Sequence, residues 1–378
     1  MKRIHLHLII YIAILLGLPS CENEIPYTPE MKQPCLVMNA LLEAGDDKTN
    51  EVFLYLSTGD NLGKLNKDAA LSLFINGRLS ETLQEADPGK LVPPSGSYAE
   101  NFSYKKYYFT TPLRPGDLIR LEATAQGGTL RATAEVQVPQ PPQNFRVDTC
   151  TVPLNMGSGI VTPHRRYLVT VNDIANENNH YRLDIRNQFL VRYHIYEYLR
   201  DEQGNFIEDE NHNLIYTERD SLASQVYSDL VNREDVILTD GNISHSQEDE
   251  DNLMFPRIEN KYNIFTDNRF RNSSATLKVY TRLYDDFTAT TLHGITYGKT
   301  YCTQSIHIRL LHLTADYYRY LKALNCLDDD DYDTVLMEPV SLPCNVSGGI
   351  GFVGIATPRE VVITFPERPC GNTNSPFP

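Results

Sequence analysis

Cys21 has the surroundings that define the clearest chemistry in the chain. Lys2 and Arg3 precede an apolar stretch over residues 8–18, and Leu18-Pro19-Ser20 leads into the cysteine. This layout is typical of a secretory signal that ends in a lipobox, with Pro19 a departure from the commonest pattern. We expect cleavage before Cys21 and its acylation with diacylglycerol and palmitate, enough buried chains for a stable membrane anchor. The alternative is an ordinary cleaved signal with a structural cysteine nearby.

Asp329, Asp331 and Asp333 have the alternating spacing of the first ligands of a calcium loop. Such a loop continues with glycine at its sixth position and glutamate at its twelfth, but Thr334 and Val340 stand there. We therefore interpret the run as a solvated acidic loop. A calcium site of another geometry is the alternative, and no other cofactor is expected.

Tyr193, Tyr196 and Tyr198 lie along one predicted strand and could form a ligand-binding face. The chain has 23 tyrosines but no tryptophan, which argues against a dedicated glycan module, because Trp is the usual platform for sugars. Tyrosine is also a common strand residue, and this structural interpretation of the three rings is preferred.

Familiar catalytic motifs are missing from the sequence. It contains no G-x-S-x-G, H-E-x-x-H or Walker A motif, and its histidines have no recognisable ligand spacing. We therefore expect a non-catalytic protein. A hydrolase with an unrecognised pair of carboxylates is the alternative, because Asp and Glu are abundant.

The charge and the cysteines limit the partners and the compartment. A net charge of −15 disfavours nucleic acid and anionic headgroups. With Cys21 assigned to lipid, an even number of widely spaced cysteines remains, without a C-x-x-C pair, so disulfides and buried free thiols both stay open. These are Cys35, Cys150, Cys302, Cys326, Cys344 and Cys370.

The elements that position these residues are predicted to be strands. After a signal peptide (1–20) and a lipidated tether (21–33), short alternating runs separated by turns such as Asn76-Gly77 predict an Ig-like antiparallel β-sandwich over 34–138. Three prolines within residues 139–143 predict a stiff linker, because proline cannot continue a strand ladder.

A larger β-rich domain is predicted over residues 144–366, before a flexible tail at 367–378. One amphipathic helix is expected at about 315–327, because Thr314 can cap it and Asp316 suits its positive first turn. The predicted fold class is therefore mostly β, with two antiparallel sandwich or barrel-like domains, the second carrying one packed helix.

Two local patterns stand out within this domain. Residues 201–207 are echoed eight positions later by residues 209–215, which predicts successive turn-and-strand units projecting from the body. Four glycines within residues 348–354 predict a structural turn or bulge with close backbone approach.

Several stretches together resemble one known family. They are Tyr107-x-Phe109, Pro112-Leu113-x-Pro115-Gly116-Asp117, Ala134-x-Val136-x-Val138-Pro139, Phe265-Thr266-Asp267-Asn268-Arg269-Phe270, Tyr317-Tyr318-Arg319-Tyr320-Leu321, Glu338-Pro339-Val340 and Asn345-Val346-Ser347-Gly348-Gly349-Ile350-Gly351. The pattern is similar to the Bacteroidetes outer-membrane lipoproteins known as domain of unknown function family 4249. The resemblance implies a gene near TonB-dependent, SusC/SusD-like transporters and carries over no catalytic residue. Glu22-Asn23-Glu24 resembles a surface-export signal of such lipoproteins, which implies an outward-facing protein.

Three functions remain in competition. The leading hypothesis is a lipid-anchored accessory lipoprotein on the outer face of the outer membrane that binds a peptide or oligosaccharide, or docks onto a TonB-dependent transporter. A cell-surface hydrolase of peptides or glycans is the first alternative. A structural envelope protein is the second.

Overall fold

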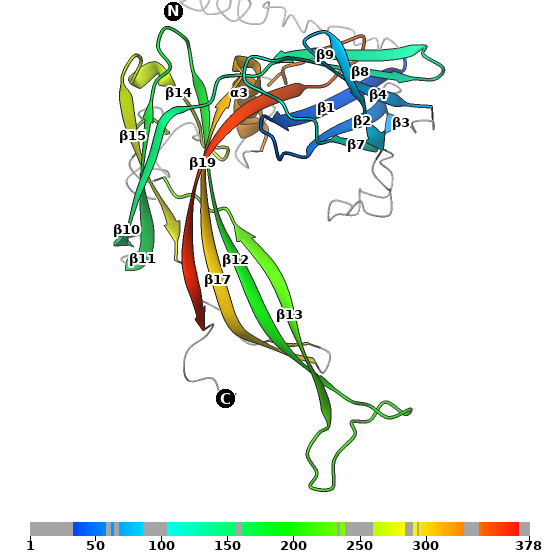
Figure 1. The fold of residues 1–378 in the computed structure, drawn as a ribbon, viewed down its shortest axis with the longest axis vertical. Helices are drawn as coiled ribbons and strands as arrows, with labels where there is room; N and C mark the ends of the chain where they lie inside the picture. The colour runs from blue at the N-terminus through cyan, green and yellow to red at the C-terminus, as the bar shows by residue number, and fades with distance from the viewer. Residues whose placement is uncertain are drawn as a thin grey trace, which may run out of the picture.

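The protein is mostly β, as the sequence predicts, and is built from open sheets with one α-helix among the residues that the structure describes (Figure 1). The computed structural model describes residues 33–57, 62–63, 68–85, 104–155, 161–232, 235–238, 260–283, 290–292, 295–328 and 340–369.

Two facing sheets enclose the first hydrophobic core. One is formed by β1 (Cys35–Glu43), β2 (Asn50–Ser57), β3 (Leu62–Gly63), β6 (Gln84–Glu85) and β7 (Lys105–Phe109). The other is formed by β4 (Ala70–Ile75), β5 (Arg78–Thr82), β8 (Leu118–Ala125), β9 (Leu130–Gln137) and β18 (Val346–Ser347). Side chains of β1 alternate strictly between the core and the opposite face of the sheet. Leu36, Met38 and Leu42 are fully buried in the core, so Asn39 and Glu43 point away from it.

The second core lies between a three-stranded sheet and a group of long strands. The three-stranded sheet contains β10 (Gln143–Asn155), β11 (Val161–Asn172) and β15 (Ser274–Arg282). The long strands are β12 (His180–Tyr198), β17 (Ile295–Leu313) and β19 (Val353–Pro369), with β14 (Ile264–Thr266) and a 3-10 turn, η3 (Asp267–Arg269), at their end. Phe265 and Phe270 stack beside Tyr181 in this core. The motif over residues 265–270, one of those that resemble the family, therefore has a structural role.

Strand β19 belongs to both halves of the protein. Its residues 353–356 pair in parallel with residues 40–43 of β1, and its residues 356–369 pair antiparallel with β17. The sheet therefore runs continuously in the order β13-β12-β17-β19-β1-β2-β7-β6. The proposed boundaries between domains stay a prediction, but the sequence did not indicate that the C-terminal strand completes the first core.

The Pro-rich linker is held against the second half by side chains. The carbonyl oxygen of Pro139 accepts a hydrogen bond from the Thr357 hydroxyl, and the carbonyl of Gln140 lies 2.7 Å from Nδ1 of the buried His312. Because both partners sit on β17 and β19, the linker fixes where β10 begins.

The far ends of the long strands form a projecting arm (Figure 1). The arm comprises residues 187–198 of β12, all of β13 (Tyr216–Tyr227), the paired ends of β17 and β19, and β16 (Thr290–Leu292). At about 3.3 Å per residue, β12 alone extends roughly 60 Å.

Helix α3 (Ala315–Leu327) confirms the predicted helix. The Thr314 hydroxyl accepts the backbone N–H of Tyr317, as expected of an N-cap. On the helix face toward the sheet, Tyr320 stacks on Phe352 with ring centroids 4.3 Å apart. The helix therefore packs on the segment that leads into β19.

The Gly-rich segment is a site of close backbone approach, as predicted. A Cβ on Gly351 would lie 2.2 Å from the Met38 carbonyl oxygen, and one on Gly349 would lie 2.4 Å from that of Leu36. Because the two backbones lie this close, the Ile350 N–H donates to the Leu36 carbonyl, and this bond extends the parallel pairing of β1 and β19. The glycines therefore let this segment lie directly on β1.

Among the described residues, all five cysteines are free: Cys35, Cys150, Cys302, Cys326 and Cys344. Cys370 lies outside them. Cys302 is buried beside Phe189 and Val191 in the arm.

Substitution of Gly351 by alanine should destabilise the protein more than the same change at Gly77. Both have positive φ, but nothing lies within 4 Å of a Cβ at position 77. We expect a loss of about 3 kcal/mol for G351A, from overpacking added to backbone strain, and about 1–2 kcal/mol for G77A from strain alone. Urea unfolding measures both, and equal losses would contradict the proposed close approach.

Candidate functional site

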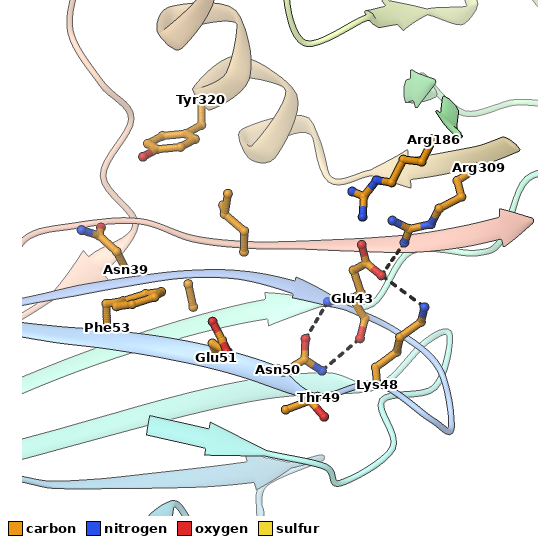
Figure 2. Close-up of a pocket in the computed structure, with 12 residues that line it drawn as sticks. Asn39, Glu43, Lys48, Thr49, Asn50, Glu51, Phe53, Arg186, Arg309 and Tyr320 are labelled. Carbon is orange, nitrogen blue, oxygen red and sulfur yellow. Dashed lines mark hydrogen bonds and ion pairs between the residues drawn. The ribbon is translucent and has the colours of Figure 1, made fainter. Parts of the chain in front are cut away.

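An open hollow of about 570 Å³ lies where the two halves meet (Figure 2). The outward faces of β1 and β2 form its floor, and β12, β17 and α3 contribute side chains from the second half. Its lining residues are Asn39, Ala40, Leu41, Glu43, Lys48, Thr49, Asn50, Glu51, Phe53, Arg186, Arg309 and Tyr320. Ligand sites are common at such junctions between domains.

A charged network occupies one end of the hollow. Glu43 Oε2 lies 2.5 Å from an Nη atom of Arg309 and 3.5 Å from Nζ of Lys48. Arg309 also contacts Asp184 at 3.3 Å, and Arg186 contacts the same carboxylate at 2.7 Å. Three cations thus meet three carboxylates, because Glu360 of β19 stands opposite Arg309 and its charge also acts on that side chain.

The central pair of this network is largely withdrawn from solvent. The Arg309 side chain is 8 % exposed and that of Glu43 29 %. Burial alone would raise the pKa of Glu43, but the hydrogen bond and charge of Arg309, with Lys48, outweigh it and hold the pKa below its ordinary value. Burial alone would lower the pKa of Arg309, but Glu43 and Asp184 outweigh it and raise the pKa. Both groups are therefore ionised at neutral pH.

The backbone brings these groups together through strand register. Asp184 of β12 stands directly opposite Arg309 of β17, so both point to the same face of the sheet. Glu43 reaches Arg309 from the last residue of β1, and its backbone is fixed by Asn50: the Glu43 N–H donates to the amide oxygen, and the amide nitrogen donates to the Glu43 carbonyl. Glu43, Asp184, Arg186 and Arg309 are therefore placed by strands, and only Lys48 comes from a loop.

The other end of the hollow is aromatic and apolar. At the end of the hollow away from Arg309, Figure 2 shows Tyr320 on the helix and Asn39 and Phe53 on the strands below it. Leu41 of β1 also lines the hollow and is 46 % exposed. The Asn39 amide oxygen accepts the N–H of Phe352, so this end is built on the segment that packs under the helix.

This arrangement is suited to binding an anionic group beside an apolar one. Arg186 and Lys48 are partly exposed and keep donors that the carboxylates do not use. Of the two carboxylates in the lining, Glu43 is bound by Arg309 and Glu51 lies 2.6 Å from Nζ of Lys106.

The metal and lipid sites expected from the sequence lie outside the described residues: Asp329, Asp331, Asp333 and Cys21. Within the described ranges, no cluster of His, Cys, Asp and Glu is placed to hold a metal ion. Within the same ranges, no helix has both the length and the apolar content needed to cross a bilayer.

The candidate tyrosines of β12 lie in the arm, away from the hollow. Tyr196 and Tyr198 are on one face, with the Tyr216 ring 5.3 and 5.8 Å from theirs, and Tyr198 also meets Phe206 at 6.0 Å. For Tyr193 the backbone is described in β12, but its side chain is not.

Sequence reasoning missed the charged network of the hollow. No partner for Arg309 was predicted from the sequence. The signal that could have found it is an arginine in the middle of a long apolar alternation, which needs a carboxylate across the strand or from another element.

Removal of the central cation should be costly. R309Q leaves the buried Asp184 with Arg186 alone and Glu43 with the exposed Lys48, so we expect a loss of about 3 kcal/mol in the free energy of unfolding. R319Q breaks an exposed pair with Asp316 and serves as the control, with a loss below about 1 kcal/mol. Similar losses in urea unfolding would show that the network contributes little.

The stabilisation from Glu43 should depend on pH. Its folded pKa lies below the ordinary value of 4.5, so acid protonates the unfolded chain first. The contribution is complete above that value and is lost as pH falls through the lowered pKa. The stability difference between the wild type and E43Q should therefore shrink from pH 7 to pH 3. A constant difference across that range would contradict the ion pair.

Comparison with known proteins identifies the family. The model for "Domain of unknown function (DUF4249)" matches residues 22–361, which include every residue that lines the hollow and all of the arm except the end of β19. No curated protein matches the chain. The chain therefore belongs to the DUF4249 family, as its sequence motifs predicted.

Proposed function

We propose that this protein is a lipid-anchored accessory protein on the outer face of the outer membrane, which captures a nutrient ligand without catalysis and docks onto a TonB-dependent, SusC/SusD-like transporter. The ligand class that fits the hollow is a peptide or oligosaccharide that carries a carboxylate. The observation that carries this proposal is the hollow itself, with an apolar end and three converging cations.

Electrostatics supports an anionic ligand. The chain as a whole has a net charge of −15, yet Lys48 and Arg186 of the hollow keep N–H donors that their carboxylate partners do not use. Unused cationic donors in a concave site favour an anionic ligand over a neutral one. Arg186 offers a planar donor pair that matches a carboxylate, while Phe53 and Tyr320 offer rings on which a sugar or side chain can pack.

The state of the carboxylates favours binding over hydrolysis. A glycosidase needs one carboxyl group that holds a proton near neutral pH and a second one nearby. In the hollow, Arg309 and Lys48 keep the pKa of Glu43 low, and Lys106 binds Glu51. A hydrolase remains the rival, and measured turnover would reverse the ranking.

Ligand titration tests the proposal. Isothermal titration of the mature protein with trigalacturonate, and with a tripeptide whose C-terminus is free, should show binding, whereas galactotriose and the amidated tripeptide should bind at least tenfold more weakly. K48Q/R186Q should lose at least tenfold in affinity; the control R78Q/R131Q, which removes two exposed arginines on β5 and β9 of the other sheet of the first core, should keep it. Equal affinity for charged and neutral ligands would overturn the assigned ligand class.

Anchoring is tested separately. Cells grown with labelled palmitate should label the wild type but not C21A, which should move to the soluble fraction. Copurification of the wild type with a TonB-dependent transporter in mild detergent would support docking. Recovery as a free monomer with no ligand bound would favour the third function, a structural envelope protein.

A further inference from the structure

The end of the arm is a small, closed structure built from the tandem repeat. We call residues 199–215 the arm tip. Ile207 N–H donates to the Leu199 carbonyl at 3.0 Å, Ile215 N–H to the Ile207 carbonyl at 2.9 Å, and Leu199 N–H to the Ile215 carbonyl at 2.9 Å. Each of three equivalent positions, eight residues apart, thus bonds to the next in a ring.

Two nearly identical loops connect the three corners of this ring. The Asp201 carboxylate accepts the N–H groups of Gln203 and Asn205 at 2.9 and 2.8 Å. In the second loop, the Asp209 carboxylate accepts those of Asn211 and Asn213, both at 2.8 Å. Carboxylates that bond their own loop in this way fix its conformation. The arm tip is therefore held in shape by its own backbone, without a core.

Apolar side chains cover the outside of this frame. Six of them are between 36 and 45 % exposed; five lie in the arm tip and the sixth is the first residue of β13: Leu199, Phe206, Ile207, Leu214, Ile215 and Tyr216. Exposed apolar side chains gathered on a rigid support are typical of a protein interface. Neither core reaches this end of the arm (Figure 1).

The surrounding charge indicates which kind of partner fits. Residues 196–220 contain eight acidic side chains and two arginines. Two of the acids, Glu202 and Glu210, are exposed at matching positions of the two loops. An anionic membrane surface and a second copy of this tip would both be repelled by this charge. A protein surface with lysines and arginines around an apolar pocket is complementary to it.

We propose that the arm tip is a docking surface for a partner protein whose contact face is basic at its rim and apolar at its centre. The proposal rests on the proposed role as an accessory protein and adds to it the surface that docks and the chemistry of the partner. The apolar residues of the tip supply the buried centre of the contact, and its carboxylates supply steering and register.

Site-specific photocrosslinking of the full lipidated chain in its own cells tests this. The probe is p-benzoylphenylalanine, placed at Phe206 or, as the control, at the exposed Leu79 of β5. Position 206 should give one adduct with an envelope protein, joined through a segment with more Lys and Arg than Asp and Glu, and position 79 should not. The reversal E202K/E210K should reduce the adduct at least tenfold, while the matched reversal D148K/E177K, at two other exposed acids, should not.

Several results would overturn the proposal. They are an adduct at position 206 no stronger than at position 79, an adduct with a second copy or with lipid, an adduct with an acidic segment, and an adduct that E202K/E210K leaves unchanged. Titration of E202K/E210K with trigalacturonate separates docking at the arm tip from ligand binding in the hollow. If E202K/E210K keeps its affinity for the ligand but loses the adduct, docking occurs at the tip. If the wild type does not bind the ligand, the proposed function of the hollow fails, but the crosslinking result still tests docking.

Discussion

The parallel pairing of β1 with the first residues of β19 is the constraint on which the rest of the protein depends. Four residue pairs, from Ala40 with Val353 to Glu43 with Ala356, join a strand at the start of the fold to one at its end. They join the strands of the first core directly to those of the second. With them, a single sheet passes through both cores, and the position of the arm is fixed relative to the first half.

The hollow is a consequence of that junction. Because β19 leaves β1 and continues along β17, the outward face of β1 turns toward the face of β12 and β17 that no second sheet covers. Glu43 then meets Arg309 across 266 residues of sequence. A charge pair desolvated in this way contributes little if it is complete and is strongly destabilising if it is broken, so the site is well positioned but sensitive to substitution.

Local signals were enough to predict some elements and not others. The helix at 315–327 was predicted because its cap, its first-turn acid and its apolar period all lie within one segment, and the Asn76-Gly77 turn because two residues define it. The pairing of β1 with β19 and the meeting of Glu43 with Arg309 depend on residues far apart in sequence, and nothing in their neighbourhoods encodes the partner. The glycines at 349 and 351 indicated close approach but not the strand approached.

The arm shows why the two candidate surfaces require different arguments. The hollow exists because two cores must meet, so a structural explanation accounts for most of its charges. Only the unused donors of Arg186 and Lys48 and the partly exposed rings of Phe53 and Tyr320 favour a ligand. The arm tip contributes to neither core, yet its ring of hydrogen bonds keeps five apolar side chains in water. Exposed apolar surface of this kind weakens solubility and adds nothing to folding. Its ordered presentation is therefore best explained by a partner that covers it.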